Sequence, residues 1–303
     1  MEKISNTIGL MSVMLMLFVT VGFAQEKKSL GEEVYKTYET SGVDAALAKY
    51  RQLKMDTTNY TVSEWELNDV AYRIMNEKND LVAAEKVFRL NMEEYPEAAN
   101  PLDSYGDYLL KKGDKEEAKE YFKKSIAISE NSSVESERNQ LYPNTKGKLA
   151  KLDNKDKQLD FLEGNWEVEE TGYNNNVEAM KRKRNHKISY DEGGSALIIR
   201  YMNDENKLEY MRIFAYDAMD DEFDVAHINP NSPQGIQISQ MKLKPKSNNE
   251  YEIIGHFNER DGKKVNMRHE LVRKADDNVN WIVFEQGEND QWEKLYSMNM
   301  KKE

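Results

Sequence analysis

The chain of 303 residues contains no cysteine. This absence excludes a disulfide scaffold, a thiol nucleophile, a cysteine-ligated zinc site and the lipidated cysteine of a bacterial lipoprotein. An excess of cations is missing too, because 43 Lys and Arg face 55 Asp and Glu, for a formal net charge of -12. Nucleic-acid binding needs clustered cations to neutralise phosphates, so the composition argues against a nucleic-acid partner.

Catalytic signatures are also lacking. The sequence holds no Gly-x-Ser-x-Gly elbow, no His-Glu-x-x-His zinc motif and no glycine-rich phosphate loop. A Ser-x-x-Lys pattern occurs at Ser239 and Lys242, but it lies in an alternating, strand-like segment instead of opening a helix. We therefore assign no catalytic residue and no metal ligand, and we expect a protein that binds rather than catalyses.

Aromatic residues, in contrast, are abundant. The chain has 17 Tyr, 9 Phe and 4 Trp, which excludes a wholly disordered chain even at a mean hydropathy of -0.86. At roughly 150 residues per domain, the length predicts about two domains. Residues 25–157 contain 22 cationic and 26 acidic side chains, and residues 158–303 contain 20 and 28, so the second part carries most of the negative charge.

The N-terminal segment has the composition of an export signal. Lys3 precedes the apolar stretch Ile8–Val21, and small residues follow at Gly22 and Ala24. The stretch is shorter than the roughly 20 residues that span a bilayer. We predict a signal peptide over residues 1–24, with an uncleaved anchor as the alternative. The protein would then be exported, periplasmic or secreted, with no membrane span after cleavage.

A repeat of 34 to 35 residues occupies the region 25–135. Ala84 and Phe88 recur as Ala118 and Phe122 at a spacing of 34. Upstream of each pair, apolar positions at intervals of three and four lie on one helix face and recur after 35 residues. These upstream positions are Leu67, Val70, Ala71 and Ile74, followed by Leu102, Tyr105, Gly106 and Leu109.

This pattern resembles the tetratricopeptide repeat, a helix-turn-helix unit of 34 residues. A more divergent unit precedes the other two, with Ser41 and Gly42 between its helices. The resemblance implies an α-helical solenoid whose surface binds a protein or peptide, or an accessory, non-catalytic part of a hydrolase system. The family's structural positions are matched by Ala71 and Gly106 on the first helices, and by Ala84, Phe88, Ala118 and Phe122 on the second.

Between the repeats and the second half, the apolar period weakens. We expect residues 136–157 to form a capping helix near Thr145–Leu152 and a linker. Asp103 and Ser104 lie close to an expected helix start, where such residues cap backbone N–H groups.

Residues 158–303 alternate polar and apolar positions in about ten segments at hairpin spacing, from Trp166–Tyr173 to Trp292–Met300. No helical pattern crosses between them, so we predict an antiparallel β-barrel, whose closure removes exposed strand edges. The predicted fold class is therefore α + β multidomain, with helical repeats followed by a barrel.

The start of the second half resembles lipocalin-like barrels of the calycin superfamily. Gly164-Asn165-Trp166 matches the family's Gly-x-Trp opening, in which the tryptophan plugs the closed end. The resemblance implies an interior site for a small apolar ligand. The family's arginine over the tryptophan is absent, and Lys294 and Lys301 are the nearest candidates.

Histidines mark a candidate ligand site in the barrel. A two-residue turn at Asp261-Gly262 would place His269 opposite Ile254 and His256 opposite Met267, with both histidines on one face. We name His256, His269, Met267 and Trp166 as candidate ligand-binding residues, with haem as a possible cofactor. A one-residue bulge after Gly262 would instead turn one strand over.

A basic run at Lys181–Arg184 has two interpretations. It binds an anionic partner or lipid headgroup, or it is a solvated hairpin or strand edge. Taken together, the sequence predicts a non-enzymatic exported binding protein, with helical repeats for a protein or peptide and a barrel for a small apolar ligand. The alternatives are a hydrolase accessory and a haem-binding barrel.

Overall fold

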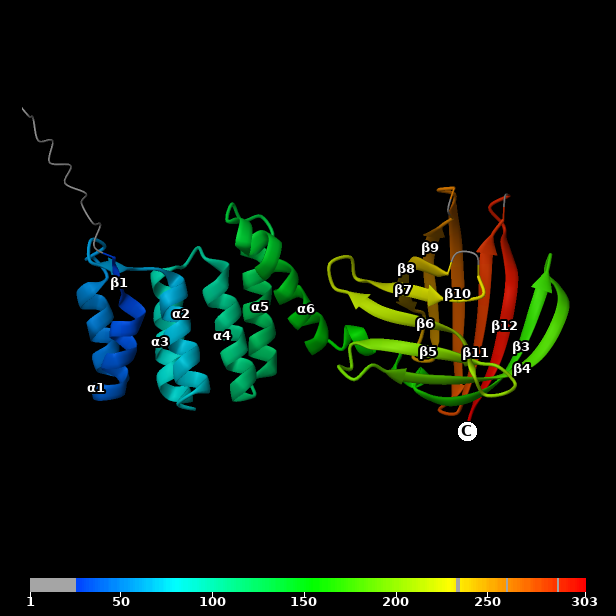
Figure 1. Ribbon diagram of the computed structural model, residues 1–303, viewed down its shortest axis with the longest axis horizontal. Helices are drawn as coiled ribbons and strands as arrows, with labels where there is room; N and C mark the ends of the chain where they lie inside the picture. The colour runs from blue at the N-terminus through cyan, green and yellow to red at the C-terminus, as the bar shows by residue number, and fades with distance from the viewer. Residues whose placement is uncertain (1–25, 233–234, 260, 288) are drawn as a thin grey trace, which may run out of the picture.

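The computed structural model describes residues 26–232, 235–259, 261–287 and 289–303. An array of helices is followed by a closed antiparallel β-barrel, which confirms the predicted α + β layout (Figure 1). The predicted signal peptide, residues 1–24, lies outside the described residues. Within the described part of the chain, every helix is too short or too polar to cross a membrane.

Antiparallel helices build the first half and lie side by side in Figure 1. The first of them breaks at Gly42, where φ is 81° and ψ is 173°, so the predicted division of the first unit is confirmed. Two short strands, β1 Lys28–Ser29 and β2 Tyr60–Thr61, pair in parallel beside it. The helices are α1 Leu30–Leu53, α2 Glu64–Asn76, α3 Leu81–Glu94, α4 Ala99–Lys112, α5 Lys115–Ser129, the π-helical turn η1 Glu137–Leu141 and α6 Tyr142–Leu152.

The repeat positions form the core of this helical half. A Cβ atom added at Gly106 on α4 would lie 2.5 Å from Cε1 of Phe122 on α5, so the absence of a side chain there lets the aromatic ring approach. Phe88 packs edge-on against Tyr72, with ring centroids 5.3 Å apart. All six predicted positions are buried, namely Ala71, Ala84, Phe88, Gly106, Ala118 and Phe122.

The prediction that Asp103 and Ser104 cap a helix is wrong. Helix α4 begins at Ala99, so both residues lie in its second turn. The carboxylate of Asp103 instead accepts hydrogen bonds from Thr145 Oγ1 at 2.7 Å and from Lys148 Nζ at 2.8 Å. These bonds connect α6 to α4. They supply the hydrogen-bond partners without which burial of the Asp103 carboxylate would be costly.

Ten antiparallel strands close the barrel, in the order β10-β11-β12-β3-β4-β5-β6-β7-β8-β9 and back to β10. The predicted number of about ten strands is confirmed. The strands are β3 Gly164–Asn174, β4 Val177–Tyr190, β5 Ala196–Met202, β6 Leu208–Asp217, β7 Glu222–Ile228, β8 Ile236–Pro245, β9 Glu250–Asn258, β10 Lys264–Ala275, β11 Asn278–Gln286 and β12 Trp292–Lys302.

One end of the barrel is closed by the chain that precedes β3. The 3-10 turn η3 Asp160–Leu162 lies there, and the indole N–H of Trp166 donates to the carbonyl of Leu162 at 2.7 Å. The cation over this indole is Lys302, whose Nζ is 5.5 Å from the ring centroid. Lys294 and Lys301 were therefore the wrong candidates. Gly164 adopts φ 136°, and a Cβ there would lie 2.4 Å from Cε of Lys302.

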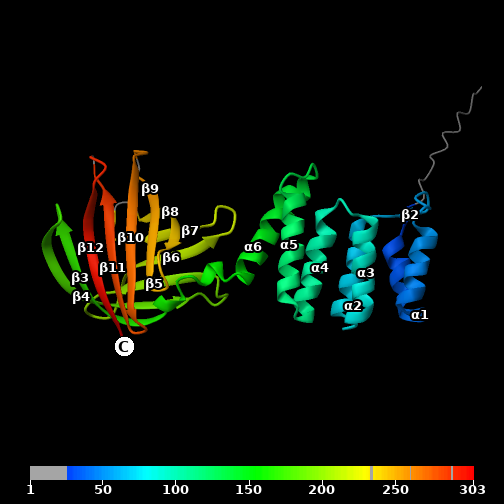
Figure 2. The same cartoon turned by 180° about the vertical axis from the view of Figure 1, so that it is seen from behind.

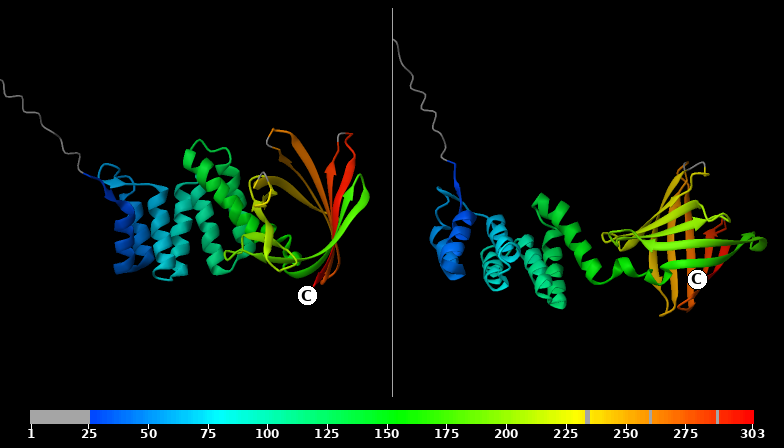
Figure 3. Two further views of the ribbon diagram at one scale, coloured as in Figure 1. Left: turned by 45° about the vertical axis from the view of Figure 1, so that its right-hand side comes forward. Right: turned by 60° about the horizontal axis from the view of Figure 1, so that its bottom comes forward.

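Lysine contacts connect the two halves. Figure 2 shows α6 between α5 and the barrel, and Figure 3 shows the same order from two further directions. Lys146 Nζ donates to the carbonyl of Met219 at 2.9 Å, and Lys155 Nζ lies 3.2 Å from the carboxylate of Asp221. Both acceptors belong to the β6–β7 turn, and a largely apolar groove lined by Leu149, Ala150, Tyr216 and Ala218 lies between the same elements.

Candidate functional site in the barrel interior

The hairpin of β9 and β10 differs from its predicted register by one residue. Arg268 lies opposite Ile254, and His269 lies opposite Ile253. The loop is longer than the predicted two-residue turn, because the N–H of Glu259 bonds the carbonyl of Lys263 and Gly262 adopts φ 87°. A glycine with positive φ in this place is typical of a bulged hairpin, which was the alternative interpretation of the sequence.

This shift separates the two predicted histidine ligands. Side chains alternate between faces along a strand, so a slip of one residue moves His256 to the outer face. His256 lies opposite Asn266, whereas His269 is 1% exposed and lies inside the barrel with Met267. The predicted pair on one face is wrong. Trp166, a third predicted residue, lies at the closed end of the barrel and does not line the interior cavity.

Six buried polar atoms inside the barrel have no hydrogen-bond partner among the described residues. Such an atom costs about 1–3 kcal/mol, and native cores hold few of them. Their concentration in one interior therefore marks a candidate binding site. The atoms are Nε of Arg184, Nε2 of His186, OH of Tyr201, Nη1 of Arg212, Nε2 of His227 and Nε2 of His269.

Adjacent strands bring these side chains together. Arg212 on β6 lies opposite His227 on β7, and His227 lies opposite Gln237 on β8. The guanidinium of Arg212 is 5.7 Å from the ring centroid of Tyr201. The rings of Tyr201 and Tyr210 stack at 4.0 Å. The polar groups therefore form one cluster rather than scattered defects.

The cluster holds more positive than negative charge. Arg182 pairs with Glu170 at 2.5 Å, and Arg184 hydrogen-bonds Glu209 and lies 3.8 Å from Glu170. Arg212 makes no ion pair within the described ranges. Three guanidinium groups thus face two carboxylates, which leaves one positive charge uncompensated inside an acidic barrel.

The interior histidines are held neutral. Burial lowers the pKa of His269 to about 3 and that of His227 to about 4, and the charge of Arg212 adds to both shifts. Burial also lowers the pKa of His186 to about 3, with further contributions from Arg184 and Arg212. None of the three therefore adds a positive charge at neutral pH.

A small cavity adjoins this cluster. Its volume is about 40 Å³, and its polar lining comprises Arg212, His227, Gln237, Ser239 and His269. Met267, Phe214 and Val225 belong to its apolar wall. A water molecule needs roughly 10–15 Å³ of cavity volume, so the cavity has room for about three water-sized groups.

The cavity does not fit a haem. A porphyrin is many times larger than the cavity, so His269 as an axial ligand would require the core to open. In the part of the chain that the structure describes, no three His, Asp or Glu side chains are grouped to hold a metal ion.

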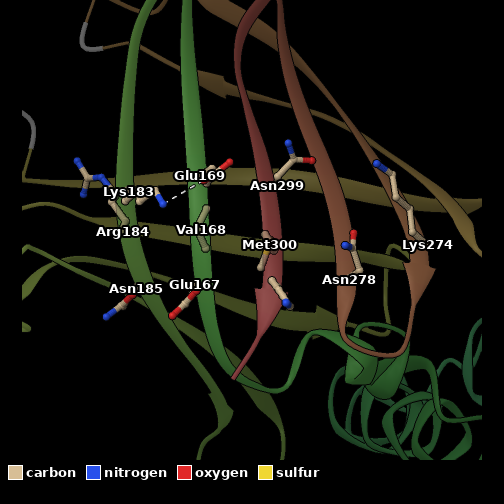
Figure 4. Close-up of a pocket in the computed structure, with 11 residues that line it drawn as sticks. Glu167, Val168, Glu169, Lys183, Arg184, Asn185, Lys274, Asn278, Asn299 and Met300 are labelled. Atoms are coloured by element: carbon tan, nitrogen blue, oxygen red, sulfur yellow. Dashed lines mark ion pairs between the residues drawn. The ribbon is translucent and has the colours of Figure 1, made fainter.

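A larger hollow of about 460 Å³ lies on the outer face of the barrel (Figure 4). Lys183 and Glu169 point into it from β4 and β3 and form an ion pair of 3.3 Å, with side chains 86% and 67% exposed. Side chains this exposed are hydrated. The hollow therefore differs from the interior, where buried polar atoms have no hydrogen-bond partner among the described residues.

The basic run lies partly on a strand edge. Residues 177–184 of β4 pair with β3 but not with β5, which pairs only with Asn185–Tyr190. Lys181 and Lys183 are exposed along this edge, as the second interpretation predicted, whereas Arg184 turns inward and is buried.

Arg212, His227, His186 and Tyr201 were not predicted as site residues. One signal for Arg212 was available, because Tyr210, Phe214 and Tyr216 occupy alternate positions around it in a predicted strand. An arginine on the aromatic face of a barrel strand is expected to point inward. The approach of Arg212 to His269 depends on strands far apart in the sequence, and a local pattern does not contain that information.

No protein-family model matches the chain, and no curated protein matches it. Solved structures are similar to part of it, among them the following two. A redesigned β-barrel, b11L5F_LGL, is 7% identical with a TM-score of 0.24, over 48% of this chain and 93% of its own. EF1p2_mFAP2b bound to DFHBI is 7% identical with a TM-score of 0.25, over 49% and 98% respectively. With TM-scores below 0.5, neither likeness bears on function.

Proposed function

We propose that this chain is a non-enzymatic, exported binding protein. Its lipocalin-like barrel holds a small ligand inside, and its tetratricopeptide-like helices present a surface to a protein or peptide. The observation that carries the first part is the group of six unpartnered polar atoms in the barrel interior. A ligand that hydrogen-bonds these atoms offsets the cost of burying them.

The cavity lining favours a ligand that carries a polar group. Five polar side chains share the wall with apolar ones, so a wholly apolar ligand would leave the polar atoms unpartnered. Pockets for drug-sized ligands measure roughly 300–1,000 Å³, and this cavity is far smaller. The ligand, or the part of it that enters the cavity, is therefore small.

Extraction tests the ligand proposal. The full chain is purified by gel filtration, denatured, and its small-molecule fraction is analysed by mass spectrometry. Thermal shifts are then recorded with a panel of small acids, amides and alcohols. We expect one compound class to co-purify or to raise the melting temperature. No co-purifying compound and no shift with any probe would contradict the proposal, because the polar interior would then be a solvated core.

An exposed tryptophan supports the second part of the proposal. Trp65 at the start of α2 is 55% exposed, and Met55 before it is 83% exposed. Tryptophan is enriched among the residues that dominate protein interfaces. A photo-crosslinker placed at position 65 should capture a defined partner, whereas one at Val82, which is 73% exposed on α3, serves as the matched control. Equal capture at both positions would contradict a specific surface.

A further inference from the structure

Building on the proposed interior site, we propose that its ligand is a small carboxylate, bound by the guanidinium of Arg212 with a hydrogen bond from Nε2 of His269. Three independent observations carry this inference. They are the direction of one hydrogen bond, the charge of the cluster and the size of the cavity.

A hydrogen bond assigns the proton on His269. The indole nitrogen of Trp281 lies 3.2 Å from Nδ1 of His269, and an indole N–H only donates. Nδ1 therefore accepts and carries no proton. A neutral imidazole has one proton, so that proton is on Nε2, and Nε2 is a donor. It is buried and has no acceptor among the described residues.

Arg212 presents a second donor to the same cavity. A guanidinium has five N–H donors and no acceptor. Its Nη1 is buried without a partner in the described part of the chain. Two of the cavity's unpartnered atoms are therefore obligate donors. A ligand that satisfies both must supply hydrogen-bond acceptors, which excludes a cation and a purely donating group.

The charge of the cluster selects an anion over a neutral acceptor. Arg212 is the guanidinium left without a carboxylate, since Glu170 and Glu209 pair with Arg182 and Arg184. Arg212 is half-buried and its Nη1 is fully buried, so part of its charge is removed from water, and an anionic ligand that pairs with it offsets that cost. A carboxylate matches the planar fork of a guanidinium with two parallel hydrogen bonds.

The cavity size limits the bound group. Room for about three water-sized groups accommodates the carboxylate of a short acid such as acetate. The same carboxylate chemistry occurs at the end of a long-chain acid, whose tail would have to leave the cavity. Acetate, hexanoate and dodecanoate distinguish these two sources.

The indole signal of Trp281 is the readout. The full chain is labelled with ¹⁵N, and the Trp281 N–H resonance is assigned by its loss in Trp281→Phe. Sodium acetate is titrated against constant ionic strength set by sodium chloride, and acetamide is titrated in parallel. We expect acetate to shift this resonance and acetamide to bind at least tenfold more weakly.

Paired arginine variants locate the site. Arg212→Met should weaken acetate binding at least tenfold. Arg200→Met is the matched control, because Arg200 lies on the adjacent strand β5 and bonds Ser189 outside the cavity. Equal affinity for acetate and acetamide in the wild-type chain would overturn the carboxylate inference while leaving the binding function in place. That comparison needs no variant, so it holds even if Arg212→Met does not fold. Binding of neither acid nor amide, whatever the chain length, would overturn the inference as well.

Discussion

Single residues determine how side chains pack in both cores of this protein, because a glycine leaves space that a neighbouring side chain fills. In the helical half, Gly106 makes room for Phe122. In the barrel, Gly164 makes room for Lys302 over Trp166. Glycine is required at these two positions because another side chain approaches the backbone closely. A count of hydrophobic residues does not predict such a requirement.

Replacing Gly106 by alanine should destabilise the helical half. The new Cβ would lie 2.5 Å from the ring of Phe122, and overpacking of this kind costs about 1–3 kcal/mol. Urea unfolding followed by circular dichroism measures the loss. Gly147→Ala on α6 is the control, since a Cβ there meets nothing within 4 Å and should be neutral or stabilising. Equal effects of both changes would contradict this account of the repeat.

The three interior histidines should make the barrel sensitive to acid. An unfolded histidine binds its proton near pH 6.5, whereas the folded pKa values are about 3 for His186 and His269 and about 4 for His227. Between those values the unfolded state binds more protons, so stability falls as the pH drops below 6.5. Each histidine should cost about 2 kcal/mol at pH 5 relative to pH 8.

His186→Gln tests this directly. The difference in unfolding free energy between pH 8 and pH 5 should shrink by about 2 kcal/mol, because glutamine does not titrate. Urea midpoints at a series of pH values provide the measurement, and an undiminished acid loss in His186→Gln would show that this imidazole is not held neutral.

At the scale of elements, polar ties hold α6 against the repeats. Lys148 Nζ lies 2.8 Å from the carboxylates of both Asp103 and Asp107, and Tyr72 donates to Asp107. Asp103 is only 7% exposed, so its charge depends on these partners. Burial raises the pKa of Asp103, and Lys148 opposes that rise.

Lys148→Met should loosen α6. Removing the ammonium leaves the Asp103 carboxylate buried with a reduced set of partners, at a cost of about 1–3 kcal/mol. Lys151→Met on the same helix is the matched control and should change little. Hydrogen exchange of the α6 amides resolves the effect by element. Unchanged exchange in Lys148→Met would show that packing alone holds the helix.

For the whole molecule, two separate cores predict two separate unfolding transitions. The buried cluster around Phe88 and Phe122 and the buried cluster around Trp281 share no residue. The hydrogen bonds and ion pairs across the junction are surface contacts such as Lys155 with Asp221, and they lie beside a partly apolar groove. Exposed or half-exposed pairs of this kind contribute about 0–1 kcal/mol, too little to couple two domains strongly.

Phe122→Ala should therefore affect one transition alone. Loss of the ring should cost about 3–5 kcal/mol in the helical half and lower only the helical transition. Calorimetry and circular dichroism at a helix wavelength are combined with tryptophan fluorescence in a Trp65→Phe background, whose remaining tryptophans all lie in the barrel. A matching fall in the barrel transition would show that the halves unfold together.

The sequence alone determined the helical character of the first half and the approximate number of barrel strands, although it did not predict β1, β2 or the turn η1. Local spacing sufficed, because a helix face repeats every three to four residues and a strand face every two. The 34-residue recurrence of Ala84 and Phe88 located the helices, and alternation predicted the ten strands.

The interior site was decided only by the tertiary structure. One extra loop residue near Gly262 placed His256 outside and left His269 inside, since a slip of one residue reverses every side chain on a strand. The meeting of Arg212, His227 and His269 required the curvature of the closed sheet, which turns the inner faces of β6, β7 and β10 toward one cavity. Each of these residues can be read from the sequence. Their contacts, and the positive charge left without a carboxylate among them, arise only when the chain folds.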